Sequence, residues 1–530
     1  MTRSTFPDID IPNTSVYDFL FGDLSDEDRA ATALVDGTTG VRTTFGQMLA
    51  QVDGLAGALA ARGVTTETTI GLLCPNAPVF AIVFHGILRA GAVVTTINSL
   101  YTPEEIANQL RDAGATWLFT VSPLLPSAEA AAKEVGIDAD HLIVIDGVDG
   151  HPSLKDLLAE QAPAPEVSFD PATHLAALPY SSGTTGRPKG VMLTHRNLVA
   201  NVAQSMATIG IEGGETVLAV LPFYHIYGLT VLLNFALKTK SALVTMPRFD
   251  LPEFLRIIQD EKCTWVFIAP PIAVALAKHP LVDNYDLSSI KGIFSGAAPL
   301  DANLAGAVAK RVGTNVRQGY GMTELSPVSH VIPMARDDIS LNSIGLGLPN
   351  LESKLVDPET GEEIPQPTSG VSEPGELMCK GPNVMLGYLN NEEATRATLE
   401  PDGWLHTGDI ATVDSDGIFT IVDRLKELIK YKGYQVAPAI LEAVLLTHPS
   451  IADAAVIGVP DEDGQEIPKA FVVIQPGAEL TDAEVMEFVT ARVAPHEKIR
   501  RVEFIDVIPK STAGKILRKD LRAKEPAAAK

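Results

Sequence analysis

The stretch YSSGTTGRPKG, residues 180–190, decides how the rest of the chain is interpreted. It follows an apolar, strand-like segment and combines three glycines, four Ser/Thr hydroxyls, an arginine and Lys189. Glycines let backbone N–H groups approach a phosphate closely, hydroxyls donate hydrogen bonds, and the lysine adds positive charge. Such a composition is also typical of a flexible loop, but strand-like flanks and the terminal charge favour a phosphate-binding turn. It is not a Walker A loop, because Pro188 stands where that motif requires glycine.

Periodic patterns on both sides of this turn predict a layered α/β fold. Helical periodicity covers 44–64 and 77–91, and short apolar strands cover 69–76 and 92–98. Such alternation is typical of a mostly parallel sheet covered by helices. At 530 residues the chain is too long for one core. We therefore expect a large N-terminal domain, residues 1–423, a hinge at 424–428, and a small, mobile α+β C-terminal domain, residues 429–530.

Composition changes divide the N-terminal domain further. A Pro/Ala-rich break at 159–174 separates one α/β subdomain, about 1–170, from a second at about 175–335. From about 340 to 422 the chain has short strands with many turns, which predicts a small β-barrel-like module. The apolar stretch 217–237 resembles a membrane span in length. Because Pro, His, Gly and Asn interrupt it, we interpret it as a buried strand, loop and helix.

Charge and cysteine content exclude several classes of function. The net charge of −25 argues against a nucleic-acid partner, which requires a basic surface. The three cysteines, Cys74, Cys263 and Cys379, are far apart and odd in number, so they form neither a disulfide framework nor a metal-ligand set. The N-terminus has no apolar signal-peptide core. We expect buried free thiols and a cytoplasmic location.

Four further segments follow the turn in a fixed order. They are GAAPL (296–300), QGYGMTE (318–324), GWLHTGDIA (403–411) with DRLKELIKYKGYQVAP (423–438), and PKSTAGKILRK (509–519). Together with SSGTTGRPKG they resemble the signatures of the adenylate-forming, or AMP-binding, superfamily. LPFYHIYGLT (221–230), KELIKYKGYQVAP and GKILRKDLRA are most similar to 4-coumarate:CoA ligases. The resemblance implies an ATP-dependent acid:CoA ligase that converts acid, ATP and CoA into acyl-CoA, AMP and pyrophosphate through an enzyme-bound acyl-adenylate.

The resemblance also implies a nucleotide site, with ATP, CoA and Mg²⁺ as the required small molecules. The implied ATP-binding residues are Ser181, Ser182, Gly183, Thr184, Thr185, Gly186, Lys189, Ala297, Ala298, Gln318, Gly319, Tyr320, Gly321, Met322, Thr323, Asp409, Arg424 and Lys515. The resemblance implies that Thr323 of this set contacts phosphate and that Lys515 bridges the α-phosphate and the attacking carboxylate, while Glu324, next to Thr323, holds Mg²⁺. The carboxylate of the substrate acid is already ionised at pH 7, so its attack on phosphorus needs no general base. It needs relief from repulsion by the triphosphate, which cations supply. Acetylation of Lys515 would remove such a charge.

For thioester formation the resemblance implies rotation of the C-terminal domain about Lys426. Rotation would bring Lys432, Gly433 and Gln435 to the acyl-adenylate in place of Lys515. His225 is expected to line the carboxylate and gate the thiol tunnel, and Arg248 to contact the CoA phosphates. The basic residues Arg518, Lys519 and Arg522 fit a solvated helix face.

The acid itself is left open by the sequence. The residues implied to line the acyl pocket are Tyr227, Val231, Phe294, Ala297, Gly319, Gly321, Pro327 and Val328. Glycines along the wall favour a flat aromatic acid such as 4-coumarate, and Tyr227 can hydrogen-bond a ring hydroxyl. Some plant relatives have lysine where this chain has Phe294, so a medium- or long-chain fatty acid fits as well. The sequence also leaves open an enzyme with a different acyl acceptor, or a catalytically inactive nucleotide-binding protein.

Overall fold

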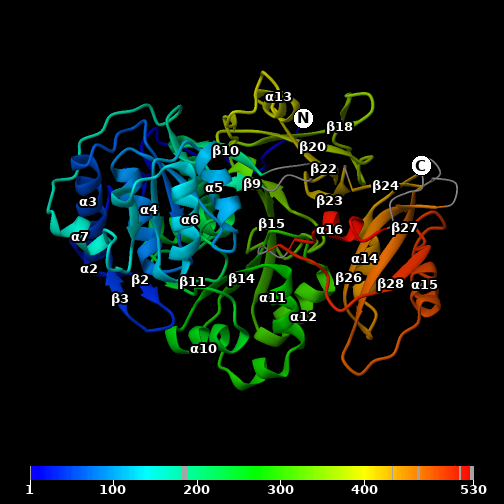
Figure 1. The fold of residues 1–530 in the computed structure, drawn as a ribbon. Helices are drawn as coiled ribbons and strands as arrows, with labels where there is room; N and C mark the ends of the chain where they lie inside the picture. Colours follow the sequence, from blue (N-terminus) through cyan, green and yellow to red (C-terminus); the bar gives the residue numbers. More distant parts are fainter. Residues whose placement is uncertain are drawn as a thin grey trace.

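The computed structural model describes residues 2–181, 188–425, 427–431, 434–461, 466–511 and 515–525. Figure 1 shows two α/β layers formed by the first two thirds of the chain, a β-rich region above them, and a separate α+β unit formed by the last hundred residues. The predicted fold class, a large N-terminal and a small C-terminal part of mixed α/β structure, is confirmed.

The first sheet has eight strands, and its centre is parallel. Two of its helices, α3 (Phe45–Ala61) and α5 (Pro103–Asp112), begin at capping boxes formed by Thr44 and Thr102. The strands, in order, are β21 (Gly387–Tyr388), β10 (Lys189–Thr194), β8 (Leu175–Ala177), β5 (Val93–Thr96), β4 (Thr69–Leu73), β6 (Trp117–Thr120) and β7 (Leu142–Val144), with β9 (Tyr180–Ser181) paired to β10. The helices are α3 (Phe45–Ala61), α4 (Pro78–Arg89), α5 (Pro103–Asp112) and α6 (Leu125–Val135).

The second sheet has nine strands and shares one large hydrophobic core with the first. Its strands, in order, are β17 (Leu346–Gly347), β16 (Val328–Val331), β15 (Asn315–Gly321), β14 (Gly292–Ser295), β13 (Trp265–Ile268), β11 (Thr216–Ala219), β12 (Ala242–Thr245), β2 (Thr32–Asp36) and β3 (Arg42–Thr44). Its helices are α8 (His195–Ile209), α10 (Leu251–Glu261), α11 (Pro270–Lys278) and α12 (Ala302–Val312).

The two sheets do not follow the expected division of the chain near 170–175. β2 and β3 join the second sheet although they precede β4, and β8 to β10 join the first although they follow the break. The pattern of a single apolar strand shows that it is buried but not which sheet it joins, because pairing depends on distant partners.

The stretch 217–237 is buried, as interpreted. It contains β11, a loop, the π-helix η3 (Tyr227–Asn234) and α9 (Phe235–Lys238). In the described parts of the chain, no helix is both long and apolar enough to cross a bilayer.

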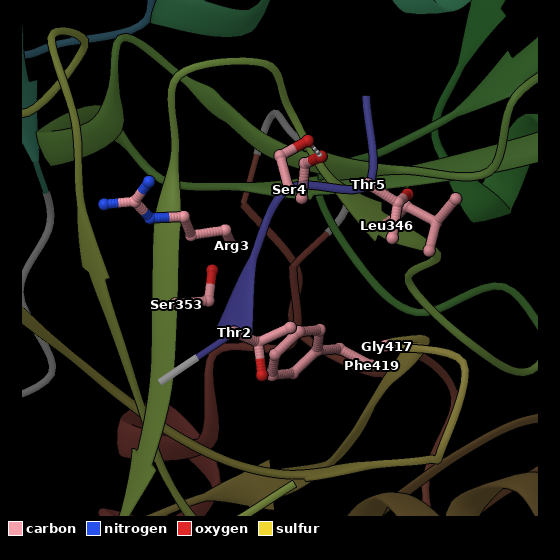
Figure 2. A pocket seen from close by; sticks show the side chains of 9 residues that line it. Thr2, Arg3, Ser4, Thr5, Leu346, Ser353, Gly417 and Phe419 are labelled. Atoms are coloured by element: carbon pink, nitrogen blue, oxygen red, sulfur yellow. Dashed lines mark hydrogen bonds between the residues drawn. The ribbon is translucent and has the colours of Figure 1, made fainter. Parts of the chain in front are cut away.

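The region predicted to be barrel-like is a six-stranded antiparallel sheet. Its order is β1 (Thr2–Arg3), β18 (Glu352–Val356), β20 (Gly375–Lys380), β22 (Leu405–Val413) and β23 (Phe419–Arg424), with β19 (Glu363–Ile364) beside β18. Among the described strands, the first and the last do not pair with each other, so the ladder is open. Figure 2 shows a small hollow beside β1, where the Ser4 hydroxyl donates to the Gly347 carbonyl at 2.6 Å. These contacts tie the N-terminal strand to the sheet.

The C-terminal unit has its own core. It contains the hairpin β24 (Ile429–Tyr431) and β25 (Tyr434–Val436), the sheet β26 (Ile451–Pro460), β27 (Glu466–Ile474) and β28 (Arg501–Phe504), and the helices α14 (Pro438–Leu446), α15 (Asp482–Thr490) and α16 (Arg518–Arg522).

Candidate functional site

The predicted phosphate turn begins and ends on paired strands. β9 and β10 are antiparallel, and Ser181 lies opposite Lys189 in the register. This pairing places a hydroxyl and an ammonium at the two ends of the same turn. Five residues of the prediction, Ser182, Gly183, Thr184, Thr185 and Gly186, lie outside the described residues.

Glu324 lies beside the base of this turn. It belongs to the short 3-10 helix η5 (Thr323–Leu325) and is only 5% exposed. Its Oε1 accepts hydrogen bonds from the Ser181 hydroxyl at 3.1 Å and from the Tyr388 hydroxyl at 2.7 Å. The ammonium of Lys189 lies 4.0 Å from the centroid of the same Tyr388 ring. Tyr388 was missed by the sequence interpretation, because only its pairing in the two-residue strand β21 brings it to this place.

A second cluster joins the second sheet to the β-rich region. Asp409 is buried, accepts a hydrogen bond from the Tyr320 hydroxyl at 2.6 Å, and pairs with Arg424 at 3.3 Å. Asp409 and Arg424 also face each other in the register of β22 and β23. Burial raises the pKa of Asp409, and the neighbouring positive charges of Arg424 and Lys515 lower it.

Lys515 enters this cluster from the C-terminal unit. Burial, together with the nearby positive charge of Arg424, lowers the pKa of Lys515 to about 8, while Asp409, Glu427 and Glu324 act in the opposite direction. Burial and the charge of Lys515 lower the pKa of His225 to about 4, so the imidazole is neutral at pH 7. His225 Nδ1 accepts a hydrogen bond from the Tyr227 amide at 3.3 Å, so Nε2 carries the proton.

The Gln318 side chain is held by backbone groups of two loops. Its side-chain oxygen accepts from the Leu300 amide at 3.0 Å, and its nitrogen donates to the carbonyls of Leu341 and Ser343 at 2.5 and 2.9 Å. The side chain therefore connects the GAAPL loop to the segment that contains Leu341 and Ser343. Ala297 in this loop has φ +70°, a conformation rarely adopted by a residue with a side chain.

One cavity contains every residue predicted for the acyl pocket. Its empty volume is about 520 Å³, part of it open to solvent. Apolar side chains and glycines form most of its wall, and His225 also lines it. The predicted lining residues are Tyr227, Val231, Phe294, Ala297, Gly319, Gly321, Pro327 and Val328, and the structure adds Ile209, Ile226, Phe267, Ser295, Gly296, Tyr320, Met322 and Val331.

Small residues on the wall cannot be enlarged without moving a neighbour. A Cβ atom at Gly321 would lie 2.1 Å from the Pro327 carbonyl oxygen. A Cβ atom at Gly296 would lie 2.7 Å from the Tyr227 ring. These two glycines therefore allow the Pro327 backbone and the Tyr227 ring to pack closely against them.

Comparison with known proteins agrees with this geometry. The model of the "AMP-binding enzyme" family matches residues 25–389, and that of the "AMP-binding enzyme C-terminal domain" matches residues 441–515. The chain belongs to the AMP-binding enzyme family. The resemblance inferred from the five ordered motifs is confirmed.

Relatives of this AMP-binding enzyme are similar over nearly their whole length. A relative named 4-coumarate–CoA ligase 5, from Oryza sativa subsp. japonica, is 43% identical over 98% of this chain and 97% of its own length. 4-Coumarate–CoA ligase 1 from Solanum tuberosum is 42% identical over 98% and 96%. The crystal structure of an anthranilate CoA ligase in complex with anthranoyl-AMP has a TM-score of 0.89 at 27% identity, covering 97% of this chain and 98% of that one. ATP-bound MatB from Rhodopseudomonas palustris has a TM-score of 0.87 at 28% identity, over 97% and 99%.

In this AMP-binding enzyme the loop that carries Lys515 is anchored by a buried ion network. Arg518, three residues later, binds both Glu442 carboxylate oxygens at 2.7 Å and also pairs with Glu427. Its Nε donates to the Val456 carbonyl at 3.2 Å. The expectation of a solvated face is therefore wrong for Arg518, while Lys519 and Arg522 are exposed. Helical spacing of charges does not reveal partners that lie about 80 residues away.

The residues predicted for the thioester step are less completely described. The hinge residue Lys426 and the loop residues Lys432 and Gly433 lie outside the described residues. Gln435 belongs to β25, opposite Lys430. Arg248 lies in an exposed loop after β12 and does not line the cavity.

Glu324 supplies the kind of ligand that a magnesium ion requires. Mg²⁺ is usually held by one or two carboxylates together with substrate phosphates and water. Oε1 of Glu324 is occupied by two donors, whereas no hydrogen bond to Oε2 is found within the described residues. Over the same residues, no group of three His, Cys, Asp or Glu side chains could hold a metal ion. The donor set thus fits an ion that is shared with a bound triphosphate.

Proposed function

We propose that this enzyme joins an aromatic carboxylic acid, a hydroxycinnamate such as 4-coumarate, to CoA at the expense of ATP, through an acyl-adenylate. The observation that carries the proposal is the cavity, whose wall contains all eight residues expected for an acyl pocket together with His225. Relatives named 4-coumarate–CoA ligase, 42–43% identical over nearly the full chain, support the same acid and acceptor.

In the first step the acid's carboxylate attacks the α-phosphorus of ATP and pyrophosphate leaves. The turn from Ser181 to Lys189 and Thr323 hold the phosphates, and Asp409 and Arg424 hold the ribose hydroxyls. Mg²⁺, bound to Glu324, would neutralise charge on the phosphates. Lys515 balances the negative charge between the carboxylate and the α-phosphate, and neutral His225 donates its Nε2–H to a carboxylate oxygen.

In the second step the CoA thiol attacks the acyl carbonyl and AMP leaves. Lys515 belongs to the C-terminal unit, so movement of this unit about Lys426 withdraws the lysine and presents Lys432, Gly433 and Gln435. Arg248, on an exposed loop, is assigned to the CoA phosphates.

The domain division at 423–428 and a cytoplasmic location belong to the same proposal. The location is supported by three free, buried cysteines whose pKa burial raises to about 12.

The shape of the cavity favours a planar ring over a flexible chain. Gly296, Gly319, Gly321 and Pro327 contribute little side chain to the wall, which leaves room for a ring, and within the described residues no hydrogen bond to the Tyr227 hydroxyl is found. This hydroxyl can therefore bind the 4-hydroxyl group of a hydroxycinnamate. Phe294 supplies an apolar wall, which keeps a medium- or long-chain fatty acid as the second candidate.

A panel of acids tests the proposal. The enzyme is incubated with ATP, Mg²⁺, CoA and either 4-coumarate, cinnamate, benzoate, octanoate or palmitate, and AMP and acyl-CoA are quantified. Equal amounts of AMP and 4-coumaroyl-CoA are expected, with a higher kcat/KM for 4-coumarate than for palmitate. A kcat/KM for palmitate tenfold above that for 4-coumarate would assign the site to fatty acids. Absence of both products with every acid would indicate an inactive nucleotide-binding protein.

A further inference from the structure

Tyr388 contacts two charged residues of the site with two different parts of its side chain. Its hydroxyl donates to Glu324 Oε1 at 2.7 Å, and its ring lies 4.0 Å from the Lys189 ammonium. We propose that Tyr388 is a positioning residue that orients the Glu324 carboxylate toward the metal of the metal–ATP complex and supports Lys189 at the phosphates. The inference deepens the proposed function and rests on its assignment of Glu324 and Lys189.

The hydrogen bond determines which carboxylate oxygen faces the metal. Ser181 and Tyr388 both donate to Oε1, and the Glu324 backbone carbonyl accepts from the Met385 amide at 2.9 Å. Glu324 is thereby held through its backbone and through Oε1, and since no donor among the described residues reaches Oε2, this oxygen can coordinate an ion. A carboxylate that is already oriented loses less conformational freedom when it binds a metal.

The ring determines where the ammonium lies. Tyr388 is paired with Val191, two residues after Lys189 on β10, so the ring and the lysine are held by adjacent strands. Tyr388 is 5% exposed, and a cation over the face of a buried aromatic ring is attracted by its electrons. The ring therefore gives the long lysine side chain a defined direction at the end of the turn.

Equilibrium binding to the full-length protein separates the two roles. Isothermal titration calorimetry, without any acid, compares Mn²⁺–ATP with ATP in excess EDTA. For Tyr388→Phe, which loses only the hydroxyl, we expect affinity for Mn²⁺–ATP about tenfold weaker, the size of one hydrogen bond to a charged group. Affinity for metal-free ATP stays unchanged. For Tyr388→Leu, which also loses the ring, both affinities fall.

Tyr180→Phe is the matched control. Tyr180 lies on the neighbouring strand, and its hydroxyl donates to the Asp112 carboxylate at 2.6 Å, away from Glu324. This variant should bind Mn²⁺–ATP like the wild type. The inference is overturned if Tyr388→Phe binds Mn²⁺–ATP within twofold of the wild type, or if Tyr180→Phe is weakened equally.

Activity gives a second measurement. In ATP–pyrophosphate exchange with 4-coumarate, the Mg²⁺ concentration for half-maximal rate should rise about tenfold in Tyr388→Phe. KM for the acid should not change, whereas a general loss of structure would alter both. If the wild type forms no acyl-adenylate with any acid, the proposed function fails while calorimetry still decides the role of Tyr388.

Discussion

Adenylation should depend on pH through the ammonium of Lys515. The pKa of this lysine is lowered to about 8, first by burial and then by the positive charge of Arg424. The charged form exists below that pKa and is lost as the pH rises through it. Because the charged form is the one that balances the negative phosphate and carboxylate, kcat/KM for ATP should be flat below pH 8 and fall above it.

The size of the fall follows from the titration of one group. One pH unit above its pKa, about a tenth of the lysine remains protonated, so the rate at pH 9 should be roughly a tenth of the plateau. Lys515→Arg keeps a cation that stays charged throughout this range. The substitution should remove the alkaline limb, while Lys515→Ala should lower the plateau itself by about 10²–10³.

ATP–pyrophosphate exchange is the appropriate assay, because it needs no CoA and so excludes titration of the thiol. Measured at ATP concentrations well below KM, it reports ionisations of the free enzyme. A wild-type profile that stays flat to pH 9.5 would refute the reasoning. The same conclusion would follow if Lys515→Arg kept an unchanged alkaline limb, because the titrating group would then be another residue.

Three further changes test separate parts of the site. Glu324→Gln should lower acyl-adenylate formation by about 10²–10³ while the thermal unfolding midpoint stays near that of the wild type; an unchanged rate and Mg²⁺ dependence would exclude Glu324 as the metal ligand. Arg518→Gln should lower the free energy of unfolding by about 3–5 kcal/mol, because Glu442 loses its buried partner; exposed Arg522→Gln on the same helix is the control, and equal stability of both variants would contradict the network. Tyr227→Phe should raise KM for 4-coumarate several-fold, because a hydrogen bond worth about 1 kcal/mol is lost. KM for cinnamate, which lacks the ring hydroxyl, should not change; equal changes for both acids would assign Tyr227 to packing alone.

Local features of the site could be predicted from the sequence. The phosphate turn was recognisable because its glycines, hydroxyls and Lys189 are consecutive, and β9 and β10 do flank it. The acyl cavity was predictable because the family resemblance could be carried over residue by residue onto the segments 227–231, 294–297 and 319–328. Helix α3 carries its own periodicity and a capping box at Thr44, and α4 has helical periodicity with Pro78 at its start, so their positions also followed from the sequence.

Features that depend on long-range pairing could not be predicted. Tyr388 reaches Glu324 only because β21 adds to the edge of the first sheet, about 200 residues after β10. Arg518 belongs to the same charged helix as its exposed neighbours, and only its ion pairs with Glu427 and Glu442 show that it is held in the interior. Gln318 lies in a nucleotide motif, yet its amide is used to brace the GAAPL loop. In each case the partner lies on a distant segment, so the local sequence of one strand or helix does not identify it.

A rapid-quench single turnover tests most directly whether the enzyme runs a two-step reaction at one site. Enzyme in excess over 4-coumarate is mixed with ATP, Mg²⁺ and CoA, and the acyl species are separated at successive times. 4-Coumaroyl-AMP should appear first and decay at the rate at which 4-coumaroyl-CoA and AMP form. Formation of ADP and phosphate, or of 4-coumaroyl-CoA without a preceding acyl-adenylate even when CoA is limiting, would contradict it.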